Sequence, residues 1–477
     1  MMCVTTRSRI LNLPMNETRV PRRTETRVPR RKGTAGNMLR SSIILAVAWV
    51  TVGHVTYTQS QQRDDPTGPA SHHGEEWPRW RGPRGNGTWH APKLLDKWPA
   101  GGLQRTWATP LGGGYAGVAA KGQRIFTMDR QTTPQDRERV VCLHASDGKP
   151  LWTHEYPINY GKLEYGNGPR ATPTIYDNRV YTLGALGHLW CLDAANGKPF
   201  WTAQLARDYQ GRMPTWGYAA SPLVVGDLVI VQPGGKGGQS VVALNRKTGS
   251  PVWKTLSDEA AYATPILIKR AGQSQLICWT PSHVRGLEPE TGKLIWAVPY
   301  QVTMGVSIAT PIFEKNILFV SGYWEGSKAI RLGGNSNPAE LLWEENRHLR
   351  GLMSQPLYRN GLAYLLDKQH GMICFDFATG KKIWDDGNRA TPRGRNPQAT
   401  LVWINQGDRA LILNSAGELI LAQLNRAGYQ ELARAKVVSN TWAHPAYAAD
   451  HIFARSDREL VAVQLPVATK RSFPANR

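Results

Sequence analysis

Residues 189–201 read Leu-Trp-Cys-Leu-Asp-Ala-Ala-Asn-Gly-Lys-Pro-Phe-Trp, and this stretch decides the fold because its second half recurs along the chain. In every copy a turn glycine stands four positions before a tryptophan, and neighbouring copies are mostly about 45 residues apart, a period typical of propellers and solenoids. The five copies are Gly148–Trp152, Gly197–Trp201, Gly249–Trp253, Gly292–Trp296 and Gly380–Trp384. The chain must therefore be read as a repeat before any local motif is interpreted.

The residues around each turn indicate β-strands. Short apolar runs such as 241–245 and 372–376 lead into the turns and are bounded by polar residues, as buried strands are. An Asn-Gly or Asp-Gly pair suits a tight hairpin because the glycine tolerates positive φ. Upstream of most turns another strand begins with Ala, Thr or Ser and then Pro, as at 171–173 and 263–265. Four antiparallel strands per unit form a propeller blade.

Counting the fourth strands gives eight blades. Seven contain a tryptophan and the eighth is a copy without tryptophan around Leu432-Ala433; the seven are Trp107, Trp152, Trp201, Trp253, Trp296, Trp343 and Trp384. The last unit, 451–465, lacks a fourth strand, whereas the first, 103–107, lacks the three strands before it. We predict an all-β, eight-bladed β-propeller of four-stranded antiparallel blades, closed by pairing of these N- and C-terminal strands, which removes open sheet edges. The repeated tryptophans are interpreted as structural packing between sheets.

The shared pattern Gly-x-Leu-x-Cys/Ala-Leu-Asp-x-x-Thr-Gly-Lys-x-x-Trp resembles the pyrroloquinoline quinone (PQQ) type repeat of quinoprotein dehydrogenases and of the BamB-like assembly lipoproteins. The resemblance covers about residues 98–466 and implies a fold, since one fold can carry many activities. Just upstream, residues 77–87 (Trp-Pro-Arg-Trp-Arg-Gly-Pro-Arg-Gly-Asn-Gly) resemble the lead-in segment of exported PQQ-like propellers of the planctomycete type.

The first part of the chain differs in composition from the repeats. Glu-Thr-Arg-Val-Pro-Arg-Arg occurs twice, at 17 and 25, within a basic stretch, and an apolar run from Ile43 to about Val55 follows Arg40. A basic region, a short apolar run and a polar exit are typical of a secretory signal, whereas a membrane span needs about 20 apolar residues. We therefore divide the chain into a basic low-complexity leader (1–37), untranslated if synthesis starts at Met38; a signal peptide or N-terminal anchor (38–60); a linker with the lead-in (61–97); the propeller (98–466); and a tail (467–477).

Charge and cysteine content narrow the function classes. Of the formal charge of +22, residues 1–37 supply nine Lys or Arg against two Asp or Glu, a surplus of seven that leaves +15 on the rest. This favours a solvated basic surface or attraction to anionic envelope polymers, with peripheral membrane association as a further option, and an exported chain is not expected to bind nucleic acid. Cys142, Cys191 and Cys374 each stand six residues before a turn glycine, where a small buried residue is needed, and Cys278 stands alone. No metal-binding pattern occurs, so we expect free structural thiols and no metal.

Binding residues of a repeat ring are expected where the copies differ. Residues just before each first strand should line the central channel at one mouth, and the candidates there are Tyr115, Arg170, Tyr218, Tyr262, Arg350, Arg395, Asn396, Trp442 and His444. Such aromatic and guanidinium groups offer stacking surfaces and hydrogen-bond donors for a ligand, or they simply plug the channel.

Two function classes remain. The PQQ dehydrogenases, as the resemblance implies, use calcium held by carboxylate and amide oxygens, a general-base Asp and often a disulfide between adjacent cysteines; the expected mouth contains neither acids nor such a pair. We therefore predict an exported, noncatalytic scaffold, monomeric and located in the periplasm or cell envelope. It would bind an envelope protein or polysaccharide through its loops and channel mouth, without a cofactor. The alternative is a dehydrogenase that oxidises an alcohol or sugar with PQQ and calcium.

Overall fold

The computed structural model describes residues 75–468, apart from 162, 335–337, 352, 395 and 397. The chain divides into two units, residues 1–67 and 68–477, and every described residue belongs to the second. The expected leader (1–37) and signal or anchor (38–60) lie outside the described residues, as does the tail beyond Ala468.

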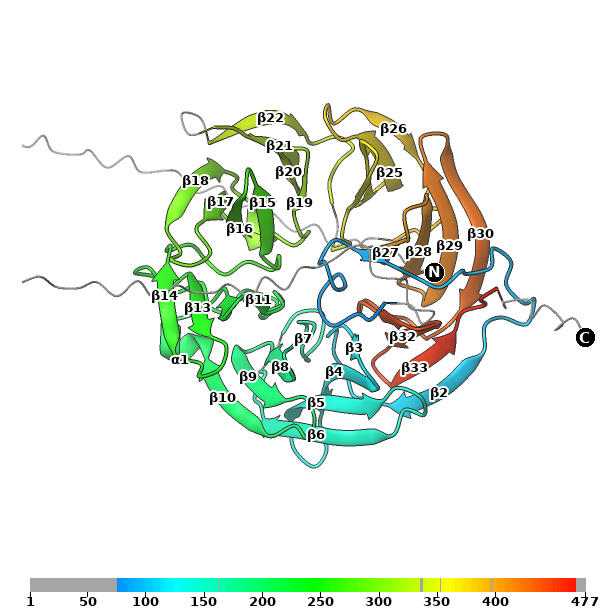
Figure 1. Ribbon diagram of the computed structural model, residues 1–477, viewed down its shortest axis with the longest axis horizontal. Coiled ribbons are helices and arrows are strands. Elements are labelled where there is room, and N and C mark those ends of the chain that lie inside the picture. Colours follow the sequence, from blue (N-terminus) through cyan, green and yellow to red (C-terminus); the bar gives the residue numbers. More distant parts are fainter. Residues whose placement is uncertain are drawn as a thin grey trace, which may run out of the picture. The chain divides into compact units, whose positions relative to one another are not determined.

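Eight antiparallel sheets form the blades of a ring, with the first strand of each blade toward the centre and the last at the rim (Figure 1). The predicted all-β, eight-bladed propeller is confirmed. Blade 1 contains β3 (Ala119–Lys121), β4 (Arg124–Gln131), β5 (Arg137–His144) and β6 (Pro150–Pro157), and blade 2 contains β7 (Thr174–Tyr176), β8 (Arg179–Leu183), β9 (His188–Asp193) and β10 (Pro199–Gln204). Blade 3 contains β11 (Leu223–Val225), β12 (Leu228–Val231), β13 (Val241–Asn245) and β14 (Pro251–Thr255), and blade 4 contains β15 (Ile266–Arg270), β16 (Gln273–Trp279), β17 (His283–Leu287) and β18 (Leu294–Pro299). Blade 5 contains β19 (Ile312–Glu314), β20 (Ile317–Gly322), β21 (Gly326–Leu332) and β22 (Ala339–Glu345), and blade 6 contains β23 (Leu357–Arg359), β24 (Leu362–Asp367), β25 (Gly371–Asp376) and β26 (Lys382–Asp385). Blade 7 contains β27 (Ala399–Ile404), β28 (Arg409–Asn414), β29 (Glu418–Asn425) and β30 (Gly428–Lys436), and blade 8 contains β31 (Ala446–Ala448), β32 (His451–Arg455) and β33 (Glu459–Gln464).

The eighth blade joins the two ends of the propeller sequence. Its fourth strand is β2 (Arg105–Pro110), which pairs antiparallel with β33, and Trp107 lies opposite Ala462. The closure predicted from the two incomplete units is therefore confirmed, and β2 covers the outer edge of β33 that would otherwise be unpaired.

A contact between neighbouring blades explains the repeated glycine and tryptophan. The indole Nε1 of Trp152 donates to the carbonyl of Ala194 in the next blade (3.1 Å), and a Cβ on Gly197 of that turn would lie 2.5 Å from the same indole. Gly197 also has a φ of 74°, which disfavours other residues. The same glycine contact recurs for Trp107 with Gly148, Trp201 with Gly249, Trp253 with Gly292 and Trp343 with Gly380. Each tryptophan thus fastens its blade to the turn of the next one.

Trp296 is an exception. Its Nε1 donates to Oε1 of Gln275 within its own blade (3.0 Å), and its ring fills the space that a Cβ on Gly286 would need. Cysteines occupy comparable small buried sites, and the four in the described part of the chain, Cys142, Cys191, Cys278 and Cys374, are free and buried.

The lead-in segment crosses the centre of the ring rather than lying outside it (Figure 1). Trp77 bridges the inner strand of blade 1 at Ala120, and the carbonyl of Pro78 accepts from Ile175 of blade 2 (2.8 Å). Farther on, β1 (Thr88–Trp89) pairs in parallel with β27 of blade 7. Trp77 and Trp89 are buried, so this segment is part of the core.

Candidate functional site

One face of the ring carries the long connections. In an antiparallel blade, the start of the first strand lies at the same end as the turn between the second and third strands. The connections between blades and these turns therefore share one face, which we call the loop face. It contains several well-exposed large apolar side chains: Tyr165 (48% exposed), Met304 (56%) and Trp324 (42%).

Five aromatic side chains from five different connections meet at the channel on this face. We call Tyr115, Tyr165, Trp216, Tyr262 and Trp442 the mouth cluster. Neighbouring ring centroids are separated by 5.8 Å for Tyr262 and Trp216, 6.5 Å for Trp216 and Tyr165, 5.8 Å for Tyr165 and Trp442, and 5.7 Å for Trp442 and Tyr115. These separations are typical of favourable aromatic contacts. The rings form a continuous chain around half of the mouth.

Arg170 holds the loop that carries Tyr165. Its guanidinium donates to the carbonyls of Gly166 (2.8 Å) and Gly168, and it lies 5.4 Å from the ring centroid of Tyr115. The Tyr115 hydroxyl donates in turn to the carbonyl of Tyr165. Burial lowers the pKa of Arg170. The loop backbone is thus fixed while the Tyr165 ring remains accessible.

Tyr165 links opposite sides of the mouth. The Asn396 amide donates to the Tyr165 hydroxyl (3.2 Å) and accepts from the Tyr323 hydroxyl of blade 5 (3.3 Å). Tyr165 also has a φ of 62°, an uncommon conformation for an aromatic residue that the surrounding contacts must maintain.

Sequence reasoning did not identify Tyr165 or Trp216. It compared residues at a fixed offset before each first strand, and both residues lie within connections whose lengths differ between blades. The unusual length of the connection 159–169 was the available signal, because long loops on a rigid scaffold often carry binding residues.

Three of the expected mouth residues are placed elsewhere, and Arg395 lies outside the described residues. Tyr218 is buried in the blade wall and donates to the carbonyl of Pro233 (2.9 Å). The ring of His444 packs on Trp80 of the lead-in, with centroids 4.2 Å apart. Burial, with a smaller contribution from Arg81, lowers the pKa of His444 to about 3, so this imidazole is neutral at ordinary pH.

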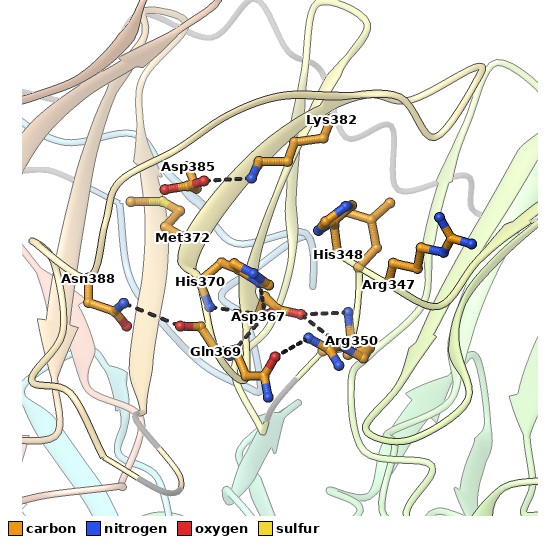
Figure 2. Close-up of polar contacts among 12 residues, drawn as sticks. Arg347, His348, Arg350, Asp367, Gln369, His370, Met372, Lys382, Asp385 and Asn388 are labelled. Carbon is orange, nitrogen blue, oxygen red and sulfur yellow. Dashed lines mark hydrogen bonds and ion pairs between the residues drawn. The ribbon is translucent and has the colours of Figure 1, made fainter.

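Arg350 belongs to a separate polar cluster between blades 5 and 6 (Figure 2). Its backbone N–H donates to the buried Asp367 carboxylate (3.0 Å), and its guanidinium donates to Gln369 (2.8 Å). Asp367 also binds the His370 imidazole (2.9 Å), beside which His348 lies with a centroid separation of 5.4 Å. Arg350 therefore orders the turn at 367–370 and does not join the mouth cluster.

The lead-in forms the next layer of the channel below the mouth cluster. Trp80 donates from Nε1 to the hydroxyl of Thr310 in blade 5 (2.9 Å), and its ring contacts the tilted ring of His444 in blade 8. Trp442 of the mouth cluster stands two residues before His444, so Trp80 contacts the same connection that carries Trp442.

The side chains at the mouth do not supply the oxygen ligands that a calcium-bound quinone cofactor would need. Calcium requires several oxygen ligands at once, usually including carboxylates. The nearest acid in the loop, Glu164, accepts from the Trp216 indole (3.1 Å), and within residues 75–468 as described no three His, Cys, Asp or Glu side chains converge on a metal position. The mouth presents aromatic faces, one guanidinium and one amide, which can stack and donate hydrogen bonds.

Comparison with known proteins agrees with this architecture. A family model described as "Outer membrane protein assembly factor BamB" matches residues 83–271, 157–386 and 280–472. BamB from Moraxella catarrhalis superimposes with a TM-score of 0.54 at 16% identity and covers 79% of this chain and 99% of that chain. The quinohemoprotein alcohol dehydrogenase ADHIIG from Pseudomonas putida HK5 gives 0.54 at 13% identity, covering 84% and 82%, and the computationally designed Ika8 protein gives 0.50 at 11%, covering 76% and 99%.

At such identities the solved structures establish the fold alone. No curated protein matches the sequence significantly. A helix long and apolar enough to cross a membrane is absent from the described residues.

Proposed function

Since the chain belongs to the family of the outer membrane protein assembly factor BamB, we propose that it is an exported, noncatalytic scaffold that binds a partner protein in the cell envelope through its loop face. The observation that carries the proposal is the loop face, which combines the fixed aromatic rings of the mouth cluster with the exposed side chains of Tyr165, Met304 and Trp324. Aromatic residues, Met and Arg are enriched in protein interfaces, and Trp, Tyr and Arg are the residues that most often dominate the binding energy.

The loop that carries Tyr165 is held in one conformation, and this favours binding. Arg170, Tyr115 and Asn396 fix the Tyr165 loop before any partner arrives, so little conformational entropy needs to be lost on association. The apolar run at 43–55 and the basic residues before it favour export, and the basic composition favours anionic surroundings such as the envelope.

Site-specific photo-crosslinking in the source cells tests this proposal. A photoreactive phenylalanine derivative at Trp324 or Met304 is expected to give a discrete adduct with one envelope protein. The same derivative at Val252, an equally exposed residue on the outer strand of blade 3, is the matched control. Adducts at Val252 but not at the loop-face positions would overturn the proposal, and adducts with polysaccharide would replace the protein partner by a polymer.

A PQQ-dependent dehydrogenase is the second candidate, because the quinohemoprotein alcohol dehydrogenase and BamB share this propeller fold and the fold alone does not separate them. We expect no saturable PQQ binding when the purified protein is titrated with PQQ and calcium and followed by Trp fluorescence. Micromolar binding that is lost in Arg170→Ala or Trp442→Ala would support this candidate over the scaffold.

A further inference from the structure

Two histidines lie beside each other on the loop face, at the junction of blades 5 and 6 (Figure 2). His348 belongs to the connection from β22 to β23, and His370 ends the turn between β24 and β25. Their ring centroids are 5.4 Å apart, and the ring planes are inclined by 69°. No spacing in the sequence predicts this pair, because one residue lies between two blades and the other lies within a blade.

Asp367 fixes the imidazole of His370. The carboxylate is fully buried, and its Oδ1 binds Nδ1 of His370 (2.9 Å) as well as the backbone N–H of the same residue (3.1 Å). Histidines that bind metals almost always donate their second ring nitrogen to a carboxylate, a carbonyl or water, which fixes the tautomer and the ring orientation. When Nδ1 of His370 donates to Asp367, the free lone pair of the neutral ring is on Nε2.

His348 combines a fixed backbone with an exposed ring. The backbone N–H groups of His348 (2.9 Å) and of the buried Leu349 (2.7 Å) donate to the Glu345 carboxylate. Neither ring nitrogen of His348, nor Nε2 of His370, has a hydrogen-bond partner among the residues that the structure describes. The side chain of His370 is 34% exposed, so solvent and ions reach this pair.

The separation of the two rings suits one shared metal ion. A Zn–N bond to imidazole is about 2.0–2.1 Å long, so two imidazoles on one tetrahedral ion have ring centroids roughly 5 Å apart. The separation of 5.4 Å between His348 and His370 is close to this value. The exposed His348 ring can turn about its Cβ–Cγ bond to direct a nitrogen at the ion. Water would fill the other coordination positions, as it does at open metal sites.

The nearest charges are largely balanced. Nε of Arg350 lies 3.5 Å from the Asp367 carboxylate, and Nζ of Lys382 lies 2.5 Å from the Asp385 carboxylate. Lys368, which precedes His370 by two positions, has its Nζ 4.5 Å from the ring centroid of Tyr323. These contacts leave little uncompensated positive charge to oppose a cation.

We propose that His348 and His370 bind one divalent transition-metal ion, with Asp367 orienting His370 from behind. Imidazole nitrogens suit copper and zinc, and Cu²⁺ generally binds such ligands more tightly than Zn²⁺ does. Hard cations such as Mg²⁺ prefer oxygen ligands and should not bind. The inference goes beyond the proposed scaffold function, since it requires no partner protein.

Titration of the full chain with Cu²⁺, followed by calorimetry and electron paramagnetic resonance, tests the proposal. The adjacent His72 and His73 of the linker are replaced by alanine in every sample so that they cannot compete. We expect one Cu²⁺ per chain at micromolar concentration, with a spectrum showing coupling to two imidazole nitrogens, and no binding of Mg²⁺. His348→Ala and His370→Ala should each weaken binding at least tenfold and remove one nitrogen from the spectrum.

His451→Ala is the matched control. His451 also binds a carboxylate, that of Asp450 (2.7 Å), but its ring packs on Phe453 rather than on a second imidazole. This variant should bind Cu²⁺ as tightly as the parent protein does. Unchanged affinity in His348→Ala or in His370→Ala would mean that the two rings do not share an ion, and binding only at millimolar Cu²⁺ would mean that they merely pack together. Either result would overturn the proposal.

Discussion

At the scale of the residue, the repeated glycine serves the tryptophan of the preceding blade. The turn needs a positive φ, and the indole of the neighbouring blade occupies the space in which a side chain would lie. Two independent constraints therefore act on one position, which explains why the glycine recurs while most other repeat positions vary.

Two substitutions separate the effect of the positive φ from the effect of the indole contact. Gly197→Ala meets both the φ penalty and the Trp152 indole, whereas Gly122→Ala has a φ of 60° and no neighbour within 4 Å. A left-handed conformation costs roughly 1–2 kcal/mol for alanine, and overpacking adds about 1–3 kcal/mol. We expect thermal melting to show a clearly lower Tm for Gly197→Ala than for Gly122→Ala. Equal Tm values would mean that the indole contact contributes nothing.

His444 predicts a specific dependence of stability on pH. Its pKa is lowered in the folded protein to about 3, so the unfolded chain, with a His pKa near its ordinary value of about 6.5, binds the proton more readily. Folding stability must therefore fall as the pH drops below about 6.5 and continue to fall toward 3. His444→Phe keeps a ring against Trp80 but does not titrate.

The measurement is the difference in the free energy of unfolding between wild type and His444→Phe at pH 7, 5 and 4. Because the side chain retains partial exposure, we expect the wild type to lose on the order of 1–3 kcal/mol more than the variant across this range. A difference that stays constant with pH would contradict the neutral state of His444 in the folded protein.

At the scale of the element, the connection 158–173 between β6 and β7 decides whether the mouth cluster is ordered. It is anchored by the buried carboxylate of Glu138, which accepts from the hydroxyls of Tyr156 (2.5 Å) and Tyr160 and from the N–H of Ala185 (3.2 Å). Burial raises the pKa of Glu138 despite these hydrogen bonds. Glu138 is thus a positioning residue for the Tyr165 loop.

Glu138→Ala leaves two buried hydroxyls without their acceptor, at a cost of about 1–3 kcal/mol for each. We expect backbone hydrogen exchange in residues 158–170 to become at least tenfold faster, while exchange in blade 6 stays unchanged. Glu155→Ala, which removes an exposed partner of Arg137 on the neighbouring strand, is the control. Unchanged exchange at 158–170 in Glu138→Ala would show that the anchor lies elsewhere.

The features that the sequence predicted accurately are those that recur along the chain. The strands and turns repeat with one offset, so the blades and the closure by 103–107 followed from comparing copies. The same offset located Tyr115, Tyr262 and Trp442. It could not locate Tyr165 and Trp216, which lie in connections of unequal length, or place Tyr218, whose hydroxyl bonds inward to the blade wall. The path of the lead-in through the ring was beyond sequence reasoning because this segment has no repeated counterpart.

At the scale of the whole molecule, stability depends on closing the ring. The closing pair β2 and β33 has registered partners from Arg105 opposite Val463 to Pro110 opposite Glu459, and Trp107 also fastens blade 8 to blade 1. This pairing is as extensive as that of ordinary outer strands such as β13 and β14. We therefore expect no weak seam at this closure.

Native-state hydrogen exchange tests whether the ring opens at the pairing of β2 with β33. Amides of β33 are expected to exchange within about tenfold of those of β13, that is, with opening free energies that differ by less than about 1.4 kcal/mol. Much faster exchange confined to β2 and β33 would mean that the ring opens at its closure.

The proposed function requires that the loop face binds the partner. Once crosslinking has identified that partner, its Kd should be measured by biolayer interferometry against the triple variant Tyr165→Ser/Met304→Ser/Trp324→Ser and the rim variant Leu151→Ser/Val252→Ser/Leu294→Ser, which removes equally exposed apolar groups. We predict at least 100-fold weaker binding for the loop-face variant, about 2.8 kcal/mol, and less than threefold for the rim variant. Equal losses, or a larger loss for the rim variant, would contradict the claim.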